Sequence, residues 1–387
     1  MKPHLCFIVT SPATALTFLS GYLQQAVDNG WRVSLICSPH DDLGSFAQVQ
    51  GADYFPVKMA REPKPGRDIM SFVHLLRQML RIRPDVLVYA TPKASLLGAL
   101  SGAFARIPVR IYEQWGLRLE GTWGTKRLVL SVLERITIGA STNVVANSDS
   151  LADAIIRLSL NGGKQIHTLG AGSSHGVDLV RYSTSASTPP VDKSTQKFLA
   201  STQGITIGFV GRLNPDKGLD VLLEALSTLH DQELKYRCII VGGSDGENVL
   251  EGLATESGLP VHLVGAVSDP RPYYKRIDVL VLPSKREGFP NVVLEAAAFN
   301  VPSVVSSATG CVDSVIDNRT GLIFRVGDAA QLAEQLYRIS SDPKTRKIMG
   351  NAARRRVEEK FPQNIVRQRH LEFFAESLNN STKVGRQ

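Results

Sequence analysis

The sequence predicts an α/β protein made of two doubly wound domains, each with a parallel sheet covered by helices on both faces. In both halves, short apolar runs rich in β-branched residues alternate with longer stretches of helical spacing, as in successive βαβ units. A polar segment rich in Ser, Thr and Pro interrupts this alternation near the middle of the chain. At 387 residues, the chain is also long for a single hydrophobic core.

The first half accounts for one domain, which we expect to span residues 1–182. Its strands are predicted at residues 5–10, 32–37, 86–90, 109–113 and 143–146. Its helices are predicted at residues 21–29, 68–82 and 94–105. Crossovers of this length between strands imply a parallel sheet.

A linker at residues 183–203 separates this domain from a second one at 204–360, because its polar composition cannot build a core. The predicted strands of the second domain lie at residues 206–210, 237–241, 261–263, 279–282 and 301–305, with a helix at 219–229. A final helix and tail at 361–387 is expected to return to the N-terminal domain. Ligands of such sheets bind beyond the carboxyl ends of the strands, so the chemistry should lie in the loops that follow them.

Composition narrows the class of protein. The net charge of +8 is concentrated in residues 1–182, which hold 19 Lys and Arg against 13 Asp and Glu. Such a basic half suits nucleic acid, an anionic membrane or an acidic substrate, but no nucleic-acid-binding signature accompanies it. The apolar run at residues 5–10 is too short for a signal peptide or a membrane span. The four cysteines lack metal-ligand spacing, and a reducing, cytoplasmic location is expected.

The first chemical motif follows the strand at 206–210. Gly211 and Gly218 permit close backbone approach, and Arg212 and Lys217 place two cations at the strand end. A diphosphate is the natural partner, because a guanidinium grips phosphate oxygens in bidentate fashion and an ammonium acts as a point charge. A solvated surface turn explains this motif equally well when it is considered alone.

The second motif follows the strand at 279–282 and makes the diphosphate interpretation the better one. Glu287 lies on the loop, Pro290 and Asn291 suit the start of a helix, and Glu295 lies about one turn inside it. The helix N-terminus offers N–H groups and partial positive charge to an anion. Two carboxylates beside a phosphate site are suited to sugar and ribose hydroxyls, whereas a capped surface helix explains either Glu alone.

Together, G-R-L-x-x-x-K-G at 211–218 and E-G-F-P-N-x-x-L-E at 287–295 resemble the donor site of glycosyltransferase family 4. The resemblance extends over nearly the whole chain. Within the family, the sequence is most similar to bacterial enzymes of capsule, exopolysaccharide and O-antigen synthesis. It implies the GT-B fold, two Rossmann-like domains that face a cleft, and retention of anomeric configuration. The implied donor-binding residues are Gly211, Arg212, Lys217, Gly242, Val264, Gly265, Glu287, Gly288, Phe289, Pro290, Asn291, Val292 and Glu295.

The resemblance also suggests a mechanism. Arg212 and Lys217 would stabilise the leaving diphosphate, Glu287 would hold the transferred sugar, and Glu295 the ribose; we take Arg212, Lys217 and Glu287 as the catalytic set. The chain contains no Asp-x-Asp pair, so we expect no metal and no cofactor besides the nucleotide sugar, with UDP favoured by the resemblance. Same-face attack is favoured over a covalent intermediate, because both carboxylates are committed to hydroxyls.

One departure from the family pattern concerns the N-terminal domain. Relatives commonly carry a histidine in the turn after the fourth strand, where this chain has Trp115. Any role of that histidine is therefore in doubt, and packing is an alternative role for the residues here. The candidates for contact with the acceptor or the donor sugar are Ser11, Pro12, Lys93, Glu113, Gln114, Trp115, Arg118 and His175.

The expected partners are a nucleotide sugar and a lipid-linked or soluble saccharide acceptor, with no nucleic acid. Lys126, Arg127 and Arg135 surround an apolar stretch at 128–133, which fits docking on an anionic membrane and a basic core helix equally well. Two other functions stay open: an epimerase of the same fold, and a non-catalytic nucleotide-sugar-binding subunit. An epimerase would need an acid/base pair that the motifs lack, and transfer assays would separate the subunit from an enzyme.

Overall fold

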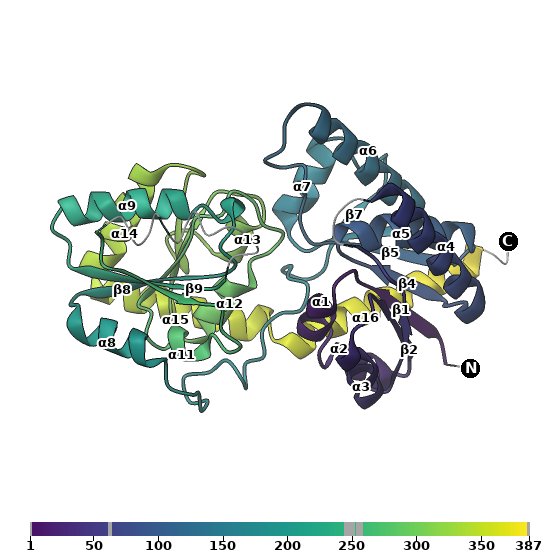
Figure 1. The fold of residues 1–387 in the computed structure, drawn as a ribbon, viewed down its shortest axis with the longest axis horizontal. Coiled ribbons are helices and arrows are strands. Elements are labelled where there is room, and N and C mark those ends of the chain that lie inside the picture. The colour runs from purple at the N-terminus through teal and green to yellow at the C-terminus, as the bar shows by residue number, and fades with distance from the viewer. Residues whose placement is uncertain (1, 61–63, 244–251, 253–257, 385–387) are drawn as a thin grey trace. The chain divides into compact units, whose positions relative to one another are not determined.

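The computed structural model describes residues 2–60, 64–243, 252 and 258–384 and divides the chain into two compact units (Figure 1). The N-terminal unit comprises residues 1–175 and 364–387, and the C-terminal unit comprises 176–363. The sequence placed these boundaries at 182 and 360. The final helix belongs to the N-terminal unit, as expected.

The N-terminal unit contains a seven-stranded parallel sheet of order β3-β2-β1-β4-β5-β6-β7. Its strands are β1 (His4–Ile8), β2 (Arg32–Cys37), β3 (Ala52–Pro56), β4 (Val86–Tyr89), β5 (Val109–Gln114), β6 (Asn143–Ala146) and β7 (Ile166–Thr168). All five predicted strands are present. The sequence missed β3, which includes an Asp and a Pro, and β7, which has only three residues.

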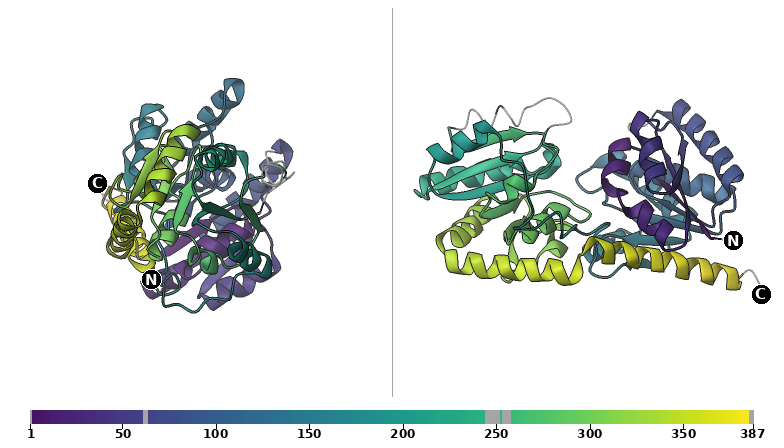
Figure 2. Two further views of the ribbon diagram at one scale, coloured as in Figure 1. Left: turned by 90° about the vertical axis from the view of Figure 1, so that its left-hand side faces the viewer. Right: turned by 90° about the horizontal axis from the view of Figure 1, so that it is seen from below.

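Helices cover both faces of this sheet, and a separate hydrophobic cluster lies under each layer (Figure 2). They are α1 (Pro12–Phe18), α2 (Tyr22–Asp28), α3 (Asp41–Val49), α4 (Pro65–Ile82), α5 (Pro92–Phe104), α6 (Gly124–Ala140), α7 (Asp149–Arg157) and α16 (Gln363–Val384). Leu371 and Phe374 of α16 belong to one of the two clusters. No helix in the described part of the chain combines the length and the apolar character needed to cross a membrane.

The C-terminal unit repeats the architecture with a six-stranded parallel sheet of order β10-β9-β8-β11-β12-β13. Its strands are β8 (Ile205–Val210), β9 (Tyr236–Val241), β10 (Val261–Gly265), β11 (Val279–Leu282), β12 (Ser303–Ser306) and β13 (Gly321–Phe324). Its helices are α8 (Lys193–Ser201), η1 (Pro215–Lys217), α9 (Leu219–Asp231), α11 (Arg271–Tyr274), α12 (Asn291–Ala298), α13 (Cys311–Ser314), α14 (Ala329–Ser341) and α15 (Pro343–Lys360). The strand predicted at 301–305 begins two residues later, and β13 was not predicted.

The segment predicted as a linker, 183–203, includes helix α8. Asp192 caps this helix by accepting a hydrogen bond of 2.9 Å from the backbone N–H of Thr195. Phe198 and Leu199 pack against the core of the C-terminal unit. Most of the helix is polar, so its composition did not predict a helix. The packing of Phe198 and Leu199 on the core stabilises it.

In each sheet the strand order reverses at one point, between β1 and β4 in the N-terminal unit and between β8 and β11 in the C-terminal unit. Loops diverge there and leave room for a ligand beyond the carboxyl ends of the strands. Both chemical motifs predicted from the sequence follow the two strands that flank the second reversal point.

Gly218 lets the loops after β8 and β11 come together. It ends η1 with φ of 67°, and a Cβ atom at this position would lie 2.1 Å from the carbonyl oxygen of Pro283. A glycine is therefore required both by the left-handed backbone and by the close approach.

We expect Gly218→Ala to destabilise the fold by about 1–3 kcal/mol or more, since strain and overlap act together. Thermal unfolding measures the loss. The control is Gly139→Ala in α6, where a Cβ meets nothing within 4 Å, and a helical alanine should stabilise by up to about 1 kcal/mol. Equal melting temperatures for Gly218→Ala and the wild type would refute the packing constraint.

Candidate active site

The loops after β8 and β11 form one polar surface at the edge of the C-terminal sheet. The backbone N–H of Lys285 donates to the carbonyl of Asp216 at 2.7 Å, and the guanidinium of Arg286 pairs with the Asp216 carboxylate at 2.5 Å. The two motifs, some 70 residues apart in sequence, are thus joined by backbone and side-chain contacts. The sequence did not identify Asp216 as a connecting residue.

Lys217 and Glu287, both predicted site residues, form an ion pair on this surface. Their side chains are only 18% and 15% exposed, and the Ser284 hydroxyl donates to the same Glu287 oxygen, Oε1, at 2.8 Å. Both of these donors therefore contact the same carboxylate oxygen of Glu287. Ser284 was not predicted, and its place two residues beyond the apolar run of β11 is the sequence signal that could have found it.

Arg212 is exposed at the end of β8, next to Gly211. Gly242 supports this turn from β9: its Cβ would lie 1.8 Å from the carbonyl oxygen of Gly211, so only glycine fits. The N–H of Gly242 in turn donates to the carbonyl of Gly265 at 2.9 Å. Three predicted residues, Gly211, Gly242 and Gly265, therefore determine the backbone path at the ends of the adjacent strands β8, β9 and β10. Val264, also predicted, is part of β10.

Helix α12 begins where the sequence placed a helix start, with Pro290 as N-cap and Asn291 as its first residue. No side-chain hydrogen bond caps this end, and the first backbone N–H groups of a helix have no partner within the helix. Phe289 is buried and packs against Phe361 with ring centroids 5.4 Å apart. Its side chain anchors the loop on the core of the C-terminal unit.

Glu295 lies in the second turn of α12, where the Tyr274 hydroxyl donates to its Oε2 at 2.8 Å. Burial raises the pKa of Glu295 to about 7, and the Tyr274 hydrogen bond and the charge of Arg181 oppose the rise. Sequence analysis missed Tyr274, since the tyrosine comes from the short helix α11.

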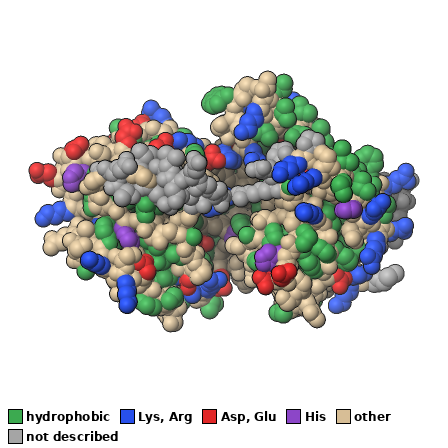
Figure 3. Space-filling view, viewed as in Figure 1, with side chains coloured by type: hydrophobic (Ala, Val, Ile, Leu, Met, Phe, Trp, Pro, Cys, Tyr) green, Lys and Arg blue, Asp and Glu red, His purple; other side chains and the backbone are tan. Residues whose placement is uncertain are grey.

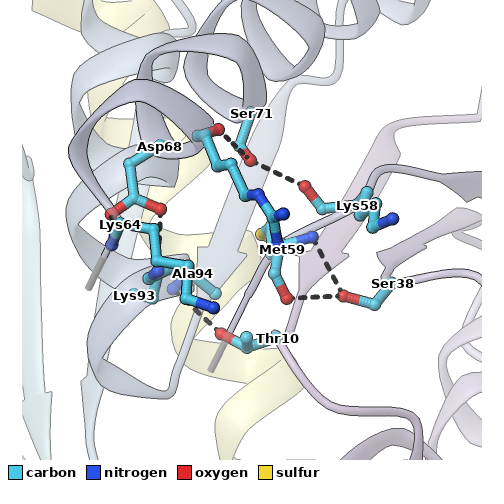
Figure 4. Close-up of polar contacts among 10 residues, drawn as sticks. Thr10, Ser38, Lys58, Met59, Lys64, Asp68, Ser71, Lys93 and Ala94 are labelled. Atoms are coloured by element: carbon cyan, nitrogen blue, oxygen red, sulfur yellow. Dashed lines mark hydrogen bonds and ion pairs between the residues drawn. The ribbon is translucent and has the colours of Figure 1, made fainter. Parts of the chain in front are cut away.

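The N-terminal unit has its own polar edge at the reversal point between β1 and β4. The Thr10 hydroxyl accepts the N–H of Ala94 at 3.1 Å, and Lys93 pairs with Asp68 at 2.7 Å (Figure 4). Ser11 and Pro12, both partly buried, begin α1 at the same edge. Four cations from the loop after β3 and the starts of α4 and α5 form what we term the basic rim, made of Lys58, Lys64, Arg67 and Lys93. Figure 4 shows Lys58, Lys64 and Lys93 of this set.

The structure places Glu113 and Gln114 inside the N-terminal unit, 4% and 2% exposed. Glu113 accepts a hydrogen bond of 2.8 Å from His370 Nδ1 of α16, and Gln114 donates to Glu134 at 3.0 Å. Burial raises the pKa of Glu134 to about 7. These two residues, predicted to contact a ligand, instead make buried hydrogen bonds within the N-terminal unit. No sequence pattern indicated their partners, His370 and Glu134.

Of the other candidates in this unit, Arg118 is exposed, whereas Trp115 and His175 are partly buried. The Trp115 ring stacks on Phe18, and the His175 ring meets Phe18 edge-on. Burial, helped by the charges of Arg367 and His370, lowers the pKa of His175 to about 3, so this imidazole is neutral at physiological pH. Phe18, the end of α1, escaped the sequence analysis.

Glu295 should make stability depend on pH. Its pKa is raised from 4.5 to about 7 in the folded state, so the buried charge destabilises the fold increasingly as pH rises from about 4.5 to 7, and fully above 7. Glu295→Gln removes this penalty, and its melting temperature relative to wild type should be higher at pH 8 than at pH 5. Each pKa unit is worth about 1.4 kcal/mol. The exposed Glu224→Gln is the control, and a pH-independent difference for Glu295→Gln would contradict the assignment.

Comparison with known proteins matches two family models to this chain. The "Glycosyl transferase 4-like domain" matches residues 16–172, and "Glycosyl transferases group 1" matches residues 191–356. The chain is 29% identical to the capsular polysaccharide biosynthesis glycosyltransferase CapM of Staphylococcus aureus over 95% of both chains. It is 26% identical to the N,N'-diacetylbacillosaminyl-diphospho-undecaprenol alpha-1,3-N-acetylgalactosaminyltransferase of Campylobacter jejuni, over 81% of this chain and 82% of the relative.

The fold is shared with solved structures. Anabaena HepE in complex with UDP superposes with a TM-score of 0.76 at 19% identity, covering 97% of this chain and 100% of HepE. The two matched domains coincide with the two parallel-sheet units. The chain therefore belongs to the family 4 glycosyltransferases, with a 4-like domain followed by a group 1 domain in the GT-B fold.

Proposed function

We propose that the protein is a retaining, metal-independent enzyme that transfers a hexose or N-acetylhexosamine from a UDP-sugar to a lipid-diphosphate-linked saccharide or another glycan. The observation that carries this proposal is the grouping of Arg212, Lys217 and Glu287 around the reversal point of the C-terminal sheet, with Glu295 in the helix that starts there. Relatives named for capsule synthesis and for undecaprenol-diphosphate acceptors, and a neighbour bound to UDP, support the choice of substrates.

The proposed roles follow from charge. As the bond between the anomeric carbon and the phosphate oxygen breaks, positive charge grows on the sugar and negative charge on the diphosphate. Arg212, Lys217 and the N–H groups that begin α12 stabilise the diphosphate. Lys217 is paired with Glu287 before donor binds, so donor binding redistributes its hydrogen bonds between the carboxylate and the phosphate.

Glu287 and Glu295 are assigned to hydroxyl groups. Glu287 Oε1 already accepts from Lys217 and Ser284, which leaves Oε2 for a hydroxyl of the transferred sugar. The acceptor hydroxyl attacks from the face that the diphosphate leaves, its oxygen bonds to the anomeric carbon, and its proton passes to the departing phosphate oxygen. The fixed cations take the place that a metal fills in other diphosphate chemistry.

An acidic acceptor fits the basic rim of the N-terminal unit. Three of its cations, Lys58, Lys64 and Arg67, are exposed, whereas Lys93 is held by Asp68. Lysine and arginine at this density suit the two charges of a lipid-linked diphosphate.

Helix α6 supports a peripheral contact with the membrane in which such a lipid resides. Its exposed apolar side chains recur at helical spacing. Two exposed cations, Lys126 and Arg135, lie near the two ends of this apolar set. The apolar set comprises Leu128, Val129, Val132, Leu133 and Ile136, with Trp123 just before the helix. Figure 3 shows hydrophobic side chains gathered over the part of this unit that Figure 1 labels α4, α5 and α6. This exposure favours docking on an anionic surface over the core-helix alternative.

The donor proposal predicts that UDP stabilises the protein in the presence of EDTA, as measured by thermal shift and calorimetric titration. Arg212→Ala should weaken UDP binding about 10- to 100-fold, because a charge-assisted phosphate contact is worth about 1.5–3 kcal/mol. The exposed Arg276→Ala, before β11, is the matched control. UDP binding that survives Arg212→Ala unchanged, or that requires added Mg²⁺, would count against the proposal.

For the membrane contact, we expect the wild type to co-sediment with vesicles containing phosphatidylglycerol and less with pure phosphatidylcholine. The pair Leu128→Asp and Val129→Asp should reduce binding by at least about tenfold, since each apolar side chain contributes about 1.5–3 kcal/mol when buried. Val49→Asp, at an 81% exposed residue of α3, serves as control. Equal binding of wild type and the α6 variant would exclude this surface.

A further inference from the structure

Three aromatic rings meet at the carboxyl edge of the N-terminal sheet, and each comes from a different loop. Phe18 ends α1, which follows β1; Trp115 follows β5 directly; and His175 lies beyond β7. The rings of Trp115 and Phe18 stack with centroids 4.9 Å apart and an interplanar angle of 19°, and His175 meets Phe18 edge-on at 4.6 Å. Convergence of loops at this edge of a parallel sheet is the arrangement in which ligands bind.

The stacked pair is not part of the hydrophobic core. Phe18 and Trp115 are both partly exposed and belong to neither of the two clusters that fill the unit. By contrast, Tyr22, in the helix that follows Phe18, is almost fully buried and is a core residue. Because the two rings are stacked face to face, each can offer only its outer face, and such a partly exposed ring at a ligand-binding edge is a flat apolar surface.

Helix α16 holds this surface in place from within the unit. Arg367 donates to the carbonyl of Ser20 at 2.6 Å, two residues beyond Phe18, and its guanidinium lies over the Tyr22 ring. His370 is hydrogen bonded to Glu113 at 2.8 Å, two residues before Trp115. Both segments that carry the rings are therefore anchored to the first turns of the same helix, so the rings are positioned before any ligand arrives.

The three rings themselves are uncharged, because the His175 imidazole is neutral at physiological pH, as its lowered pKa requires. The four cations of the basic rim come from other segments of the unit, whereas the exposed Arg118 lies on the same loop as Trp115. The rim cations are thus separate from the stacked rings. That division suits a ligand with a neutral ring at one position and a diphosphate at another.

We propose that Trp115 and Phe18 form an aromatic platform that binds the apolar face of the acceptor's terminal sugar ring. A pyranose directs most hydroxyls outward around its rim and presents C–H groups on its faces, so stacking removes apolar area from water on both partners while the hydroxyls stay solvated or hydrogen bonded. This inference rests on the proposed transferase function and assigns residue 115 the task of setting acceptor affinity. The donor contacts assigned above lie in the C-terminal unit and do not involve these rings.

The test uses the full-length protein and one defined probe, an α-linked N-acetylglucosaminyl diphosphate carrying a short phenoxyalkyl chain. Its dissociation constant is measured by calorimetry without donor, for Trp115→Ala, Trp115→Leu, Trp115→Phe and Phe18→Leu. We expect Trp115→Ala and Trp115→Leu to weaken binding at least about tenfold, equivalent to about 1.4 kcal/mol. Trp115→Phe, which keeps a ring, should stay within about threefold of wild type.

The matched control is Phe104→Ala, which removes a 70% exposed ring that pairs with Phe72 at the far end of α5. UDP-induced thermal shift should be unchanged in every variant and reports correct folding. Wild-type affinity in Trp115→Ala, equal losses in the Leu and Phe variants, or no binding of the probe by the wild type would overturn the platform. Transfer to the probe from UDP-sugars is assayed separately: binding that depends on Trp115 without any transfer by the wild type would leave the platform standing and refute the proposed transferase function.

Discussion

The close approach of the loops after β8 and β11 is the constraint on which the rest of the candidate donor site depends. It requires a residue without a side chain at Gly218 and is secured by the backbone bond from Lys285 to Asp216. Because of it, Lys217 can reach Glu287, and Ser284 can add a second donor to the same oxygen. A parallel sheet supplies the reversal point, but the site requires two specific loops to touch there.

The two units arrange their polar and charged residues differently. In the C-terminal unit, charged residues are paired with one another, as Lys217 with Glu287 and Arg286 with Asp216. Such pairs lower the cost of holding charge in a partly buried place. In the N-terminal unit, buried polar residues such as Glu113 and Gln114 support the edge from inside, while rings and cations face outward.

Much of the fold could be predicted from local sequence because parallel strands that are buried on both faces are continuous apolar runs. The predicted limits of β2, β6 and β11 agree with the structure. Short or polar elements were missed for physical reasons: β7 has three residues, and α8 owes its place to two side chains that pack on the core. Two motifs supplied the candidate donor residues, but no pattern could reveal that Tyr274 contacts Glu295, or that His370 contacts Glu113 across 257 positions.

Helix α16 has a consequence for the order in which the protein is made. The C-terminal unit is one continuous segment, 176–363, whereas the N-terminal unit needs residues from both ends of the chain. Leu371 and Phe374 fill its core, and until His370 emerges Glu113 has no partner from α16. During synthesis from the N-terminus, the unit that starts first is therefore completed last, and its unfinished core stays open while the whole C-terminal unit is translated. The unit that holds most of the exposed large apolar side chains among the described residues is thus also the unit whose folding is completed last.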